Sequence, residues 1–305
     1  MPVKYAFIVG MPRSGTTLLC ELLGRHPSII PTPETHLFRR YFRTPRAVGT
    51  ILSGAEQSRL ADRFERDDRL GQLDLAAIVD AARGEGVART GAALLQEVLL
   101  AGSGARDGQL ILEKTPDHVF FLPALKLAFP DSLIIHIYRD PRAVSASLKQ
   151  VPWDNNPAVW HARQWRRAVS AASGAGAAVH HVAYEDLVRA PEDVLSDLFA
   201  RLGVEPASTL NRQSAESSFD PHLEPWKARA SAPPDPSRLD WWRLTLNRGD
   251  IAVIEAVCGG QMPRLGYQRE HRLQTGDVAA LGAQSAQLLG SVPRSVGKSL
   301  GWVAR

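Results

Sequence analysis

The chain has 305 residues, of which 44% are hydrophobic and 22% charged, proportions typical of a folded globular protein. Its 36 basic residues exceed its 32 acidic residues by four, a surplus too small to indicate a nucleic-acid-binding protein. The two cysteines, Cys20 and Cys258, lie far apart, so we expect no disulfide framework and no metal cluster. Because no run of 18 apolar residues occurs, no membrane span is expected.

The chain begins with an apolar run at residues 5–9, followed by a glycine-containing turn at 10–15 and a helical pattern with Leu18 and Leu22 on one face. Strand, glycine loop and helix form the arrangement that cradles phosphate, because loop amides and the positive end of the helix point at one anion. The strand begins so early that no signal peptide is expected, which favours a cytoplasmic protein.

The loop nearly matches the P-loop pattern G-x-x-x-x-G-K-[ST]. Gly10, Gly15 and Thr17 fit, but Thr16 occupies the lysine position and the basic residue is Arg13. A P-loop NTPase needs that lysine on the β- and γ-phosphates. The loop therefore predicts a different phosphorylated donor.

Strand and helix patterns alternate along the rest of the chain, which predicts an α/β fold with a central parallel sheet flanked by helices in three layers. Further strands are expected at residues 28–31, 110–112, 132–138 and 175–184. Helices are expected at 73–82, 92–100, 119–129 (kinked at Pro123), from Asp140-Pro141 onward, and at 157–173, 191–202 and 250–258. Residues 37–108 should be mostly helical and 211–240 a long loop. We expect one domain, 1–270, and a tail, 271–305, that is helical, flexible or a homodimer contact.

Polar and basic residues follow three of the expected strands, at residues 10–17, 114–116 and 138–142. The carboxyl ends of parallel strands share one edge of a sheet, so Arg13, Lys114 and Arg139 should surround one site. Three positive groups at one site predict a ligand with several negative charges. One anion would occupy the loop, and Arg139 with a helix hydroxyl, Ser145 or Ser147, would bind a second.

In these residues the chain resembles the sulfotransferases that use 3′-phosphoadenosine-5′-phosphosulfate (PAPS), in the pattern of the tyrosylprotein sulfotransferases and their bacterial relatives. The resemblance is carried by Met11-Pro-Arg-Ser-Gly-Thr-Thr17, by Glu34 at 21 residues after Arg13, by Glu113-Lys-Thr-Pro116, and by Tyr138-Arg-Asp-Pro-Arg142 through Ser147. It implies a P-loop-like fold and transfer of a sulfuryl group from PAPS to a hydroxyl, with adenosine 3′,5′-bisphosphate as the other product and no metal. The acceptor stays open: a small molecule, a glycan, a lipid or a peptide.

The resemblance also implies a role for each matching residue. Glu34 would take the acceptor's proton, and Arg13 and Lys114 would stabilise the charge that develops on the leaving group. The donor would be bound by Arg13, Ser14, Gly15, Thr16 and Thr17 at the 5′-phosphate, by Arg139 and Ser147 at the 3′-phosphate, and by Tyr184 at the nucleotide.

Two other functions remain open. A P-loop kinase using Mg-ATP is disfavoured by Thr16 and by Arg139, which stands where a Walker-B acid is wanted. A nucleotide-binding module without catalysis is disfavoured by the presence of the three implied catalytic residues. His36 stands where the tyrosylprotein enzymes carry an arginine, which weakens the case for a peptide acceptor and makes His36 an alternative base. Lys227, in the long loop, is a further basic residue without a firm role.

Overall fold

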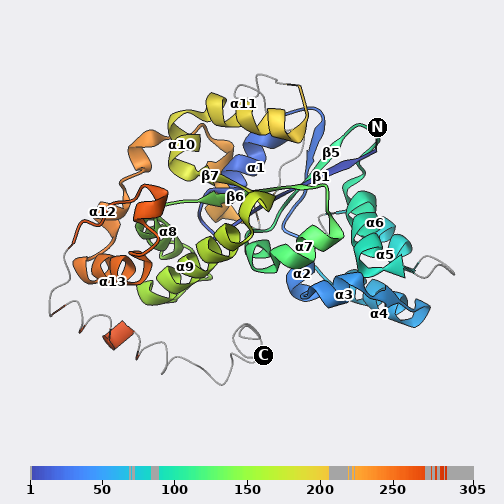
Figure 1. The fold of residues 1–305 in the computed structure, drawn as a ribbon, viewed down its shortest axis with the longest axis horizontal. Coiled ribbons are helices and arrows are strands. Elements are labelled where there is room, and N and C mark those ends of the chain that lie inside the picture. Colours follow the sequence, from blue (N-terminus) through green and yellow to red (C-terminus); the bar gives the residue numbers. More distant parts are fainter. Residues whose placement is uncertain are drawn as a thin grey trace. The chain divides into compact units, whose positions relative to one another are not determined.

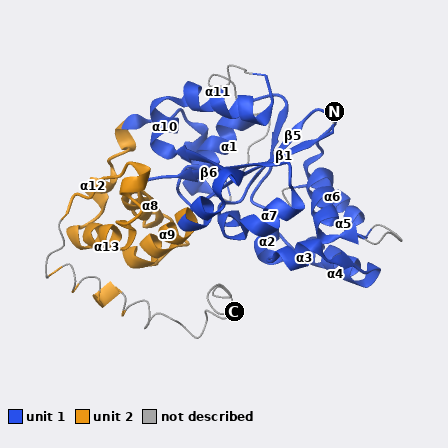
Figure 2. Cartoon of the chain, viewed as in Figure 1, with its two compact units in different colours: residues 1–139, 170–236 blue, residues 140–169, 237–305 orange. Residues whose placement is uncertain are grey.

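The protein is described by a computed structural model that covers residues 2–68, 70, 73–83, 89–205, 219, 222, 224–271, 276, 279, 282–284 and 286. The chain divides into two compact units, shown in Figure 2: residues 1–139 with 170–236, and residues 140–169 with 237–305. The expected boundary between a domain, 1–270, and a tail, 271–305, stays a prediction. Residues 287–305 and most of 206–223 lie outside the described residues.

Unit 1 is built on a five-stranded parallel sheet in the order β2-β5-β1-β6-β7. The strands are β1 (Lys4–Gly10), β2 (Ile29–Pro31), β5 (Leu110–Lys114), β6 (Leu133–Tyr138) and β7 (Val179–Ala183). β1 is central, and its residues 6–9 are at most 1% exposed. A parallel strand that is covered on both faces has a continuous run of apolar residues, so the sequence pattern predicted β1.

Two crossovers that run in opposite directions place helices on both faces of the sheet. From β1 the chain passes through α1 (Thr16–Gly24) to β2, and from β5 it passes through η2 (Pro116–Phe121) and α7 (Leu122–Ala128) to β6. Because such crossovers are right-handed, α1 and α7 lie on opposite faces. Figure 1 shows α10 (Tyr184–Arg189) and α11 (Pro191–Leu202) on the α1 side, where the rings of His26 and Phe199 contact each other with centroids 5.2 Å apart. The predicted three-layer α/β fold is confirmed.

The segment between β2 and β5 is mainly helical, as expected, but it also contains two short strands. The helices are α2 (Leu37–Arg40), α3 (Pro45–Gly49), α4 (Gly54–Glu65), α5 (Leu75–Arg83) and α6 (Gly91–Ser103). β3 (Ile51–Leu52) pairs antiparallel with β4 (Arg89–Thr90). Strands of two residues carry no detectable period, so no sequence pattern predicts this pair.

Unit 2 contains α8 (Pro141–Leu148), the first part of α9 (Ala158–Gly174), α12 (Trp242–Thr245), α13 (Arg248–Cys258) and η6 (Pro263–Leu265). Asp140 caps α8 as predicted, accepting a hydrogen bond from the Arg142 amide at 2.8 Å. The buried Arg142 guanidinium joins three helices, because it pairs with Asp140 at 2.6 Å and Glu255 at 2.7 Å and lies 4.2 Å from the ring of Trp242.

Three other expected boundaries are wrong, each for a local reason. Pro123 lies in the first turn of α7 and does not kink a longer helix, since a 3₁₀ helix ends at Phe121. The last strand is shorter than 175–184, because residues 176–178 form a 3₁₀ turn and Tyr184 opens α10. The expected loop at 211–240 contains two 3₁₀ helices, η4 (Pro225–Ser231) and η5 (Pro236–Arg238).

Candidate active site

The glycine loop between β1 and α1 has the geometry of an anion site. Ser14 is fully buried, and its hydroxyl has no hydrogen-bond partner among the described residues. Its amide closes a turn on the Met11 carbonyl at 3.1 Å, and Arg13 adopts a left-handed conformation with φ 72°. A buried hydroxyl is costly unless a ligand satisfies it, and strained backbone persists mainly at functional sites. With the first amides of α1, at Thr16 and Thr17, the Ser14 hydroxyl fits a bound phosphate group.

Tyr184 closes one side of this loop. Gly15 has φ 97°, and a Cβ added there would lie 2.3 Å from the Tyr184 ring. The Arg139 guanidinium covers the same ring at 4.2 Å from its centroid. The fold of unit 1 therefore places Gly15 and Arg139, from two different segments, against the ring of Tyr184, from a third.

Two guanidinium groups lie beside the loop. Arg13 donates to the Trp226 carbonyl at 3.2 Å, and Arg139 donates to the Arg13 carbonyl at 3.4 Å. Burial, followed by the charge of Arg139, lowers the pKa of Arg13. Two positive groups this close repel each other, so this position favours a negatively charged ligand.

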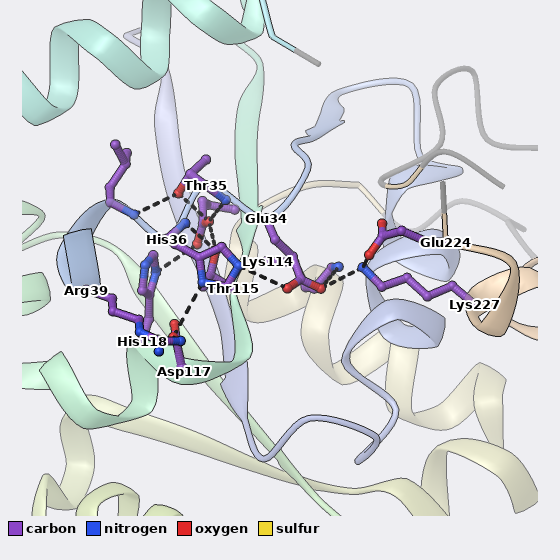
Figure 3. Close-up of polar contacts among 12 residues, drawn as sticks. Glu34, Thr35, His36, Arg39, Lys114, Thr115, Asp117, His118, Glu224 and Lys227 are labelled. Carbon is purple, nitrogen blue, oxygen red and sulfur yellow. Dashed lines mark hydrogen bonds and ion pairs between the residues drawn. The ribbon is translucent and has the colours of Figure 1, made fainter. Parts of the chain in front are cut away.

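Glu34 and Lys114 form a pair at the carboxyl edge of the sheet, shown in Figure 3. Lys114 is the last residue of β5 and is fully buried, and its Nζ donates to Oε1 of Glu34 at 2.8 Å. Lys227, from η4, donates to the same oxygen at 2.7 Å and also pairs with Glu224 at 2.6 Å. Because β2 and β5 are neighbours, the segment that follows β2 carries Glu34 over the end of β5.

These contacts determine the charge states of the pair. Burial would raise the pKa of Glu34, but Lys114, His36 and Lys227 outweigh it and hold that pKa well below its usual 4.5. Burial would lower the pKa of Lys114, yet Glu34 raises it above 10.5. Both groups are therefore ionised at neutral pH, which is what a base and a cationic stabiliser require.

The buried carboxylate of Glu113 connects the segment that carries Glu34 with the segment that carries Lys114. Glu113 is 1% exposed and accepts hydrogen bonds from the hydroxyls of Thr35, at 2.8 Å, and Thr115, and from Nδ1 of His118 at 3.1 Å. Burial would raise the pKa of Glu113, but His118 and the two hydroxyls hold it below 4.5. This network ties the residue after Glu34 to the residues on either side of Lys114.

The model of the Sulfotransferase family matches residues 6–208, two thirds of the chain. The chain belongs to the sulfotransferase family. A curated relative, the nodulation protein NoeE of Sinorhizobium fredii, is 32% identical over 143 residues, which are 47% of this chain but only 30% of NoeE.

Two solved sulfotransferase domains share the fold. The domain from the Synechococcus PCC 7002 olefin synthase has a TM-score of 0.57 at 23% identity and covers 93% of this chain and 95% of that domain. The domain from the curacin biosynthetic pathway has a TM-score of 0.60 at 19% identity, and the match covers 88% of this chain and 99% of that domain. At these identities the likeness concerns the fold alone; the tyrosylprotein-like branch stays a prediction.

The two serines proposed for a second anion, Ser145 and Ser147, have different surroundings. Ser145 is fully buried and bonds Nδ1 of His161 at 2.9 Å, while Nε2 of His161 bonds Asp154 at 3.1 Å, so Ser145 belongs to the core of unit 2. Ser147 is half-buried on the same helix. Arg139 belongs to unit 1 and Ser147 to unit 2, and their joint action on one phosphate stays a prediction.

Sequence reasoning missed the role of two charged residues in the cluster. Lys227 shares a Glu34 oxygen with Lys114, although 193 residues separate it from Glu34. Asp117 approaches Nδ1 of His36 at 3.4 Å. Asp117 follows Lys114 by three residues, a signal that could have been used, whereas no pattern in the sequence links Lys227 to Glu34.

Two absences concern only the part of the chain that the structure describes. No group of three or more His, Cys, Asp or Glu side chains is placed to hold a metal ion there. Within the same part of the chain, none of the helices combines the length and the apolar character that crossing a membrane requires.

Proposed function

We propose that this chain transfers a sulfuryl group from PAPS to a hydroxyl acceptor and releases adenosine 3′,5′-bisphosphate. The observation that carries this proposal is the ionised Glu34–Lys114 pair at 2.8 Å, on the same sheet edge as a phosphate loop without the NTPase lysine. A carboxylate base, a buried cation and a phosphate cradle are the parts that such a transfer needs, since positioning and charge stabilisation supply most of the catalysis.

The reaction balances with Glu34 as the base. The acceptor O–H proton moves to the Glu34 carboxylate while the acceptor oxygen forms a bond to sulfur. The bond between sulfur and the bridging oxygen breaks, and its electron pair stays on the 5′-phosphate oxygen of the product. Arg13 and Lys114 stabilise that developing charge; removal of one such group typically costs about 10²–10³ in rate.

The donor is distinguished from ATP by its second phosphate. Ser14, Gly15, Thr16 and Thr17 hold the 5′-phosphate in the glycine loop. Arg139 and Ser147 bind the 3′-phosphate, and Tyr184, beneath the Arg139 guanidinium, contacts the nucleotide. Neither the loop nor the residue after β6 supplies the lysine or the acid of an Mg-ATP kinase.

The acceptor is proposed only as a hydroxyl compound: a small molecule, a glycan, a lipid or a peptide. In Figure 3, Arg39 of the helical segment 37–108 and Lys227 of η4 lie on opposite sides of Glu34, which makes these two segments the candidates for acceptor recognition.

The experiment is a thermal-shift titration with adenosine 3′,5′-bisphosphate, ADP and Mg-ATP, each over the same concentrations. A ligand at about 100 times its dissociation constant adds roughly 2.7 kcal/mol to the free energy of unfolding, a shift of several degrees. A shift with the bisphosphate alone supports the donor site and leads to PAPS turnover assays with a phenol, a sugar, a lipid alcohol and a tyrosine peptide. A shift with Mg-ATP alone would replace this proposal by the kinase.

A further inference from the structure

The two oxygens of the Glu34 carboxylate have different partners. Oε1 accepts from the ammonium groups of Lys114 and Lys227, at 2.8 and 2.7 Å. Oε2 faces Nε2 of His36 at 3.5 Å. One oxygen is thus shared by two flexible side chains, and the other faces a planar ring.

His36 is fixed from three directions. Its Nδ1 lies 3.4 Å from Oδ2 of Asp117, and that same oxygen accepts from Arg39 at 3.2 Å. Its backbone has φ 51°, a left-handed conformation that is uncommon outside glycine, and its amide donates to the Thr115 hydroxyl at 3.3 Å. A non-glycine residue held in this conformation next to a reactive carboxylate is typical of a functional constraint.

The lysines and the histidine differ in how easily they leave Glu34. A lysine ammonium rotates on a four-carbon stem and can turn toward a phosphosulfate group without backbone movement. The imidazole has two ring nitrogens in fixed directions, one toward Glu34 and one toward Asp117. A turn of Lys114 and Lys227 toward the donor would free Oε1 for the acceptor hydroxyl, whereas Oε2 would stay next to the His36 ring.

We propose that His36, oriented by Asp117, is a positioning residue that anchors Oε2 of Glu34, so that Oε1 is the atom that receives the acceptor's proton. This inference rests on the proposed function of Glu34. It assigns His36 and Asp117 to the reaction without direct contact to the donor or the acceptor.

The charges around Glu34, His36 and Asp117 agree with this assignment. Lys114, Lys227 and His36 face Glu34, and Arg13 acts on it from the glycine loop. His36 itself is faced by two carboxylates; although burial lowers its pKa, Asp117 and Glu34 raise it to about 9. Burial would raise the pKa of Asp117, but His36, His118 and Arg39 hold it below its usual 3.8, so Asp117 stays ionised. At neutral pH His36 is therefore protonated on both ring nitrogens and cannot serve as the alternative base.

The first test needs neither donor nor acceptor. The imidazole resonances of the full chain are titrated by NMR, and His36 is assigned as the signal missing in His36→Asn, a change that tolerates a left-handed backbone. His36 should titrate near pH 9 in the unaltered chain and at lower pH in Asp117→Asn. A His36 that titrates at or below pH 6.5 overturns the proposal.

The second test is kinetic, with PAPS and whichever of the four acceptors above is turned over. His36→Asn and Asp117→Asn should each lower kcat by about 10- to 100-fold, as for a misplaced catalytic group, while the Kd for adenosine 3′,5′-bisphosphate stays within about twofold. The acid limb of kcat should move to higher pH in His36→Asn, because a positive charge beside Glu34 is lost. His181→Asn, an exposed histidine of β7, is the matched control and should behave like the unaltered chain.

The outcomes separate the two proposals. An unaltered chain that turns over none of the acceptors while binding Mg-ATP overturns the proposed function, whereas the NMR titration still tests the His36–Glu34 pair. Active variants with kcat within twofold of the unaltered chain and an unmoved acid limb overturn the role of His36. If His36→Asn unfolds at the assay temperature, Asp117→Asn decides the question through the same two readouts.

Discussion

A methyl group at Gly15 would test whether the glycine loop is packed against Tyr184 as tightly as the structure indicates. With φ 97°, Gly15 has a conformation that L-residues rarely adopt. An alanine Cβ would lie 2.3 and 2.9 Å from two Tyr184 ring carbons and 3.3 Å from Cδ1 of Ile137. Gly15→Ala therefore introduces both backbone strain and a clash with a rigid ring.

The two contributions can be separated with a second glycine. Left-handed backbone costs about 1–2 kcal/mol in an L-residue, and overpacking a filled site costs about 1–3 kcal/mol. We expect Gly15→Ala to lower the free energy of unfolding by about 2–5 kcal/mol. Gly176→Ala, at φ 58° and with no described atom within 4 Å of the added Cβ, should show only the strain, about 1–2 kcal/mol.

The measurement is denaturant unfolding of both variants, of Tyr184→Ala and of the double variant Gly15→Ala/Tyr184→Ala. Removing the ring relieves the clash, so the double variant should be more stable than the sum of the single changes by about 1–3 kcal/mol. Gly15→Ala should also weaken bisphosphate binding, and Gly176→Ala should not. Equal losses for Gly15→Ala and Gly176→Ala, with additive behaviour in the double variant, would refute the packing argument.

Four further predictions concern single side chains. Glu34→Gln should cut saturated turnover by about 10²–10⁴ and leave the Kd for the bisphosphate unchanged; a loss under tenfold removes Glu34 from the role of base. Arg139→Ala should raise that Kd far more than it slows saturated turnover. Calorimetry measures the Kd and initial rates measure the turnover; a large loss of turnover with little change in Kd would contradict the 3′-phosphate assignment. Because folding lowers the pKa of Glu113, this carboxylate stabilises the folded chain above pH 4.5, and the stabilisation is lost as the pH falls further. Because folding raises the pKa of His36, this imidazolium stabilises the folded chain below pH 6.5, and the stabilisation is lost as the pH rises through about 9. Unfolding midpoints should follow both slopes, with the acid slope reduced in Glu113→Gln and the alkaline slope absent in His36→Asn; unchanged slopes count against these pairs.

Strong local patterns made much of the fold predictable. The first strand is an apolar run because parallel strands are covered on both faces, and the helix that starts after Asp140-Pro141 carries both a capping side chain and a proline at its first position. The pair β3–β4 and the 3₁₀ segments were not predictable, because such short elements are set by their surroundings and not by a repeat.

The proximity of Glu34 and Lys114 was predictable in outline, since both follow strands of one parallel sheet. The direct ion pair between them was not, because it depends on β2 pairing with β5 and on the network that binds Thr35 to Glu113. Lys227 reaches Glu34 from a segment with no periodic pattern, and only the folded chain shows the contact.

The lowered pKa of Glu34 has a kinetic consequence. A carboxylate held by two lysines and an imidazolium is a weak base, which is unfavourable for removing a hydroxyl proton. Glu34 is close enough to Arg13 of the glycine loop to raise the pKa of that arginine, so the negative charges of a donor bound in the loop would raise the proton affinity of Glu34. The acid limb of kcat, which reports the complex, should therefore lie at higher pH than the acid limb of kcat/KM for the donor, which reports the free enzyme. Full pH profiles with PAPS decide this: coincident limbs, or a limb of kcat at lower pH, would show that donor binding leaves the base unchanged and that the lysines remain on Glu34 throughout the reaction.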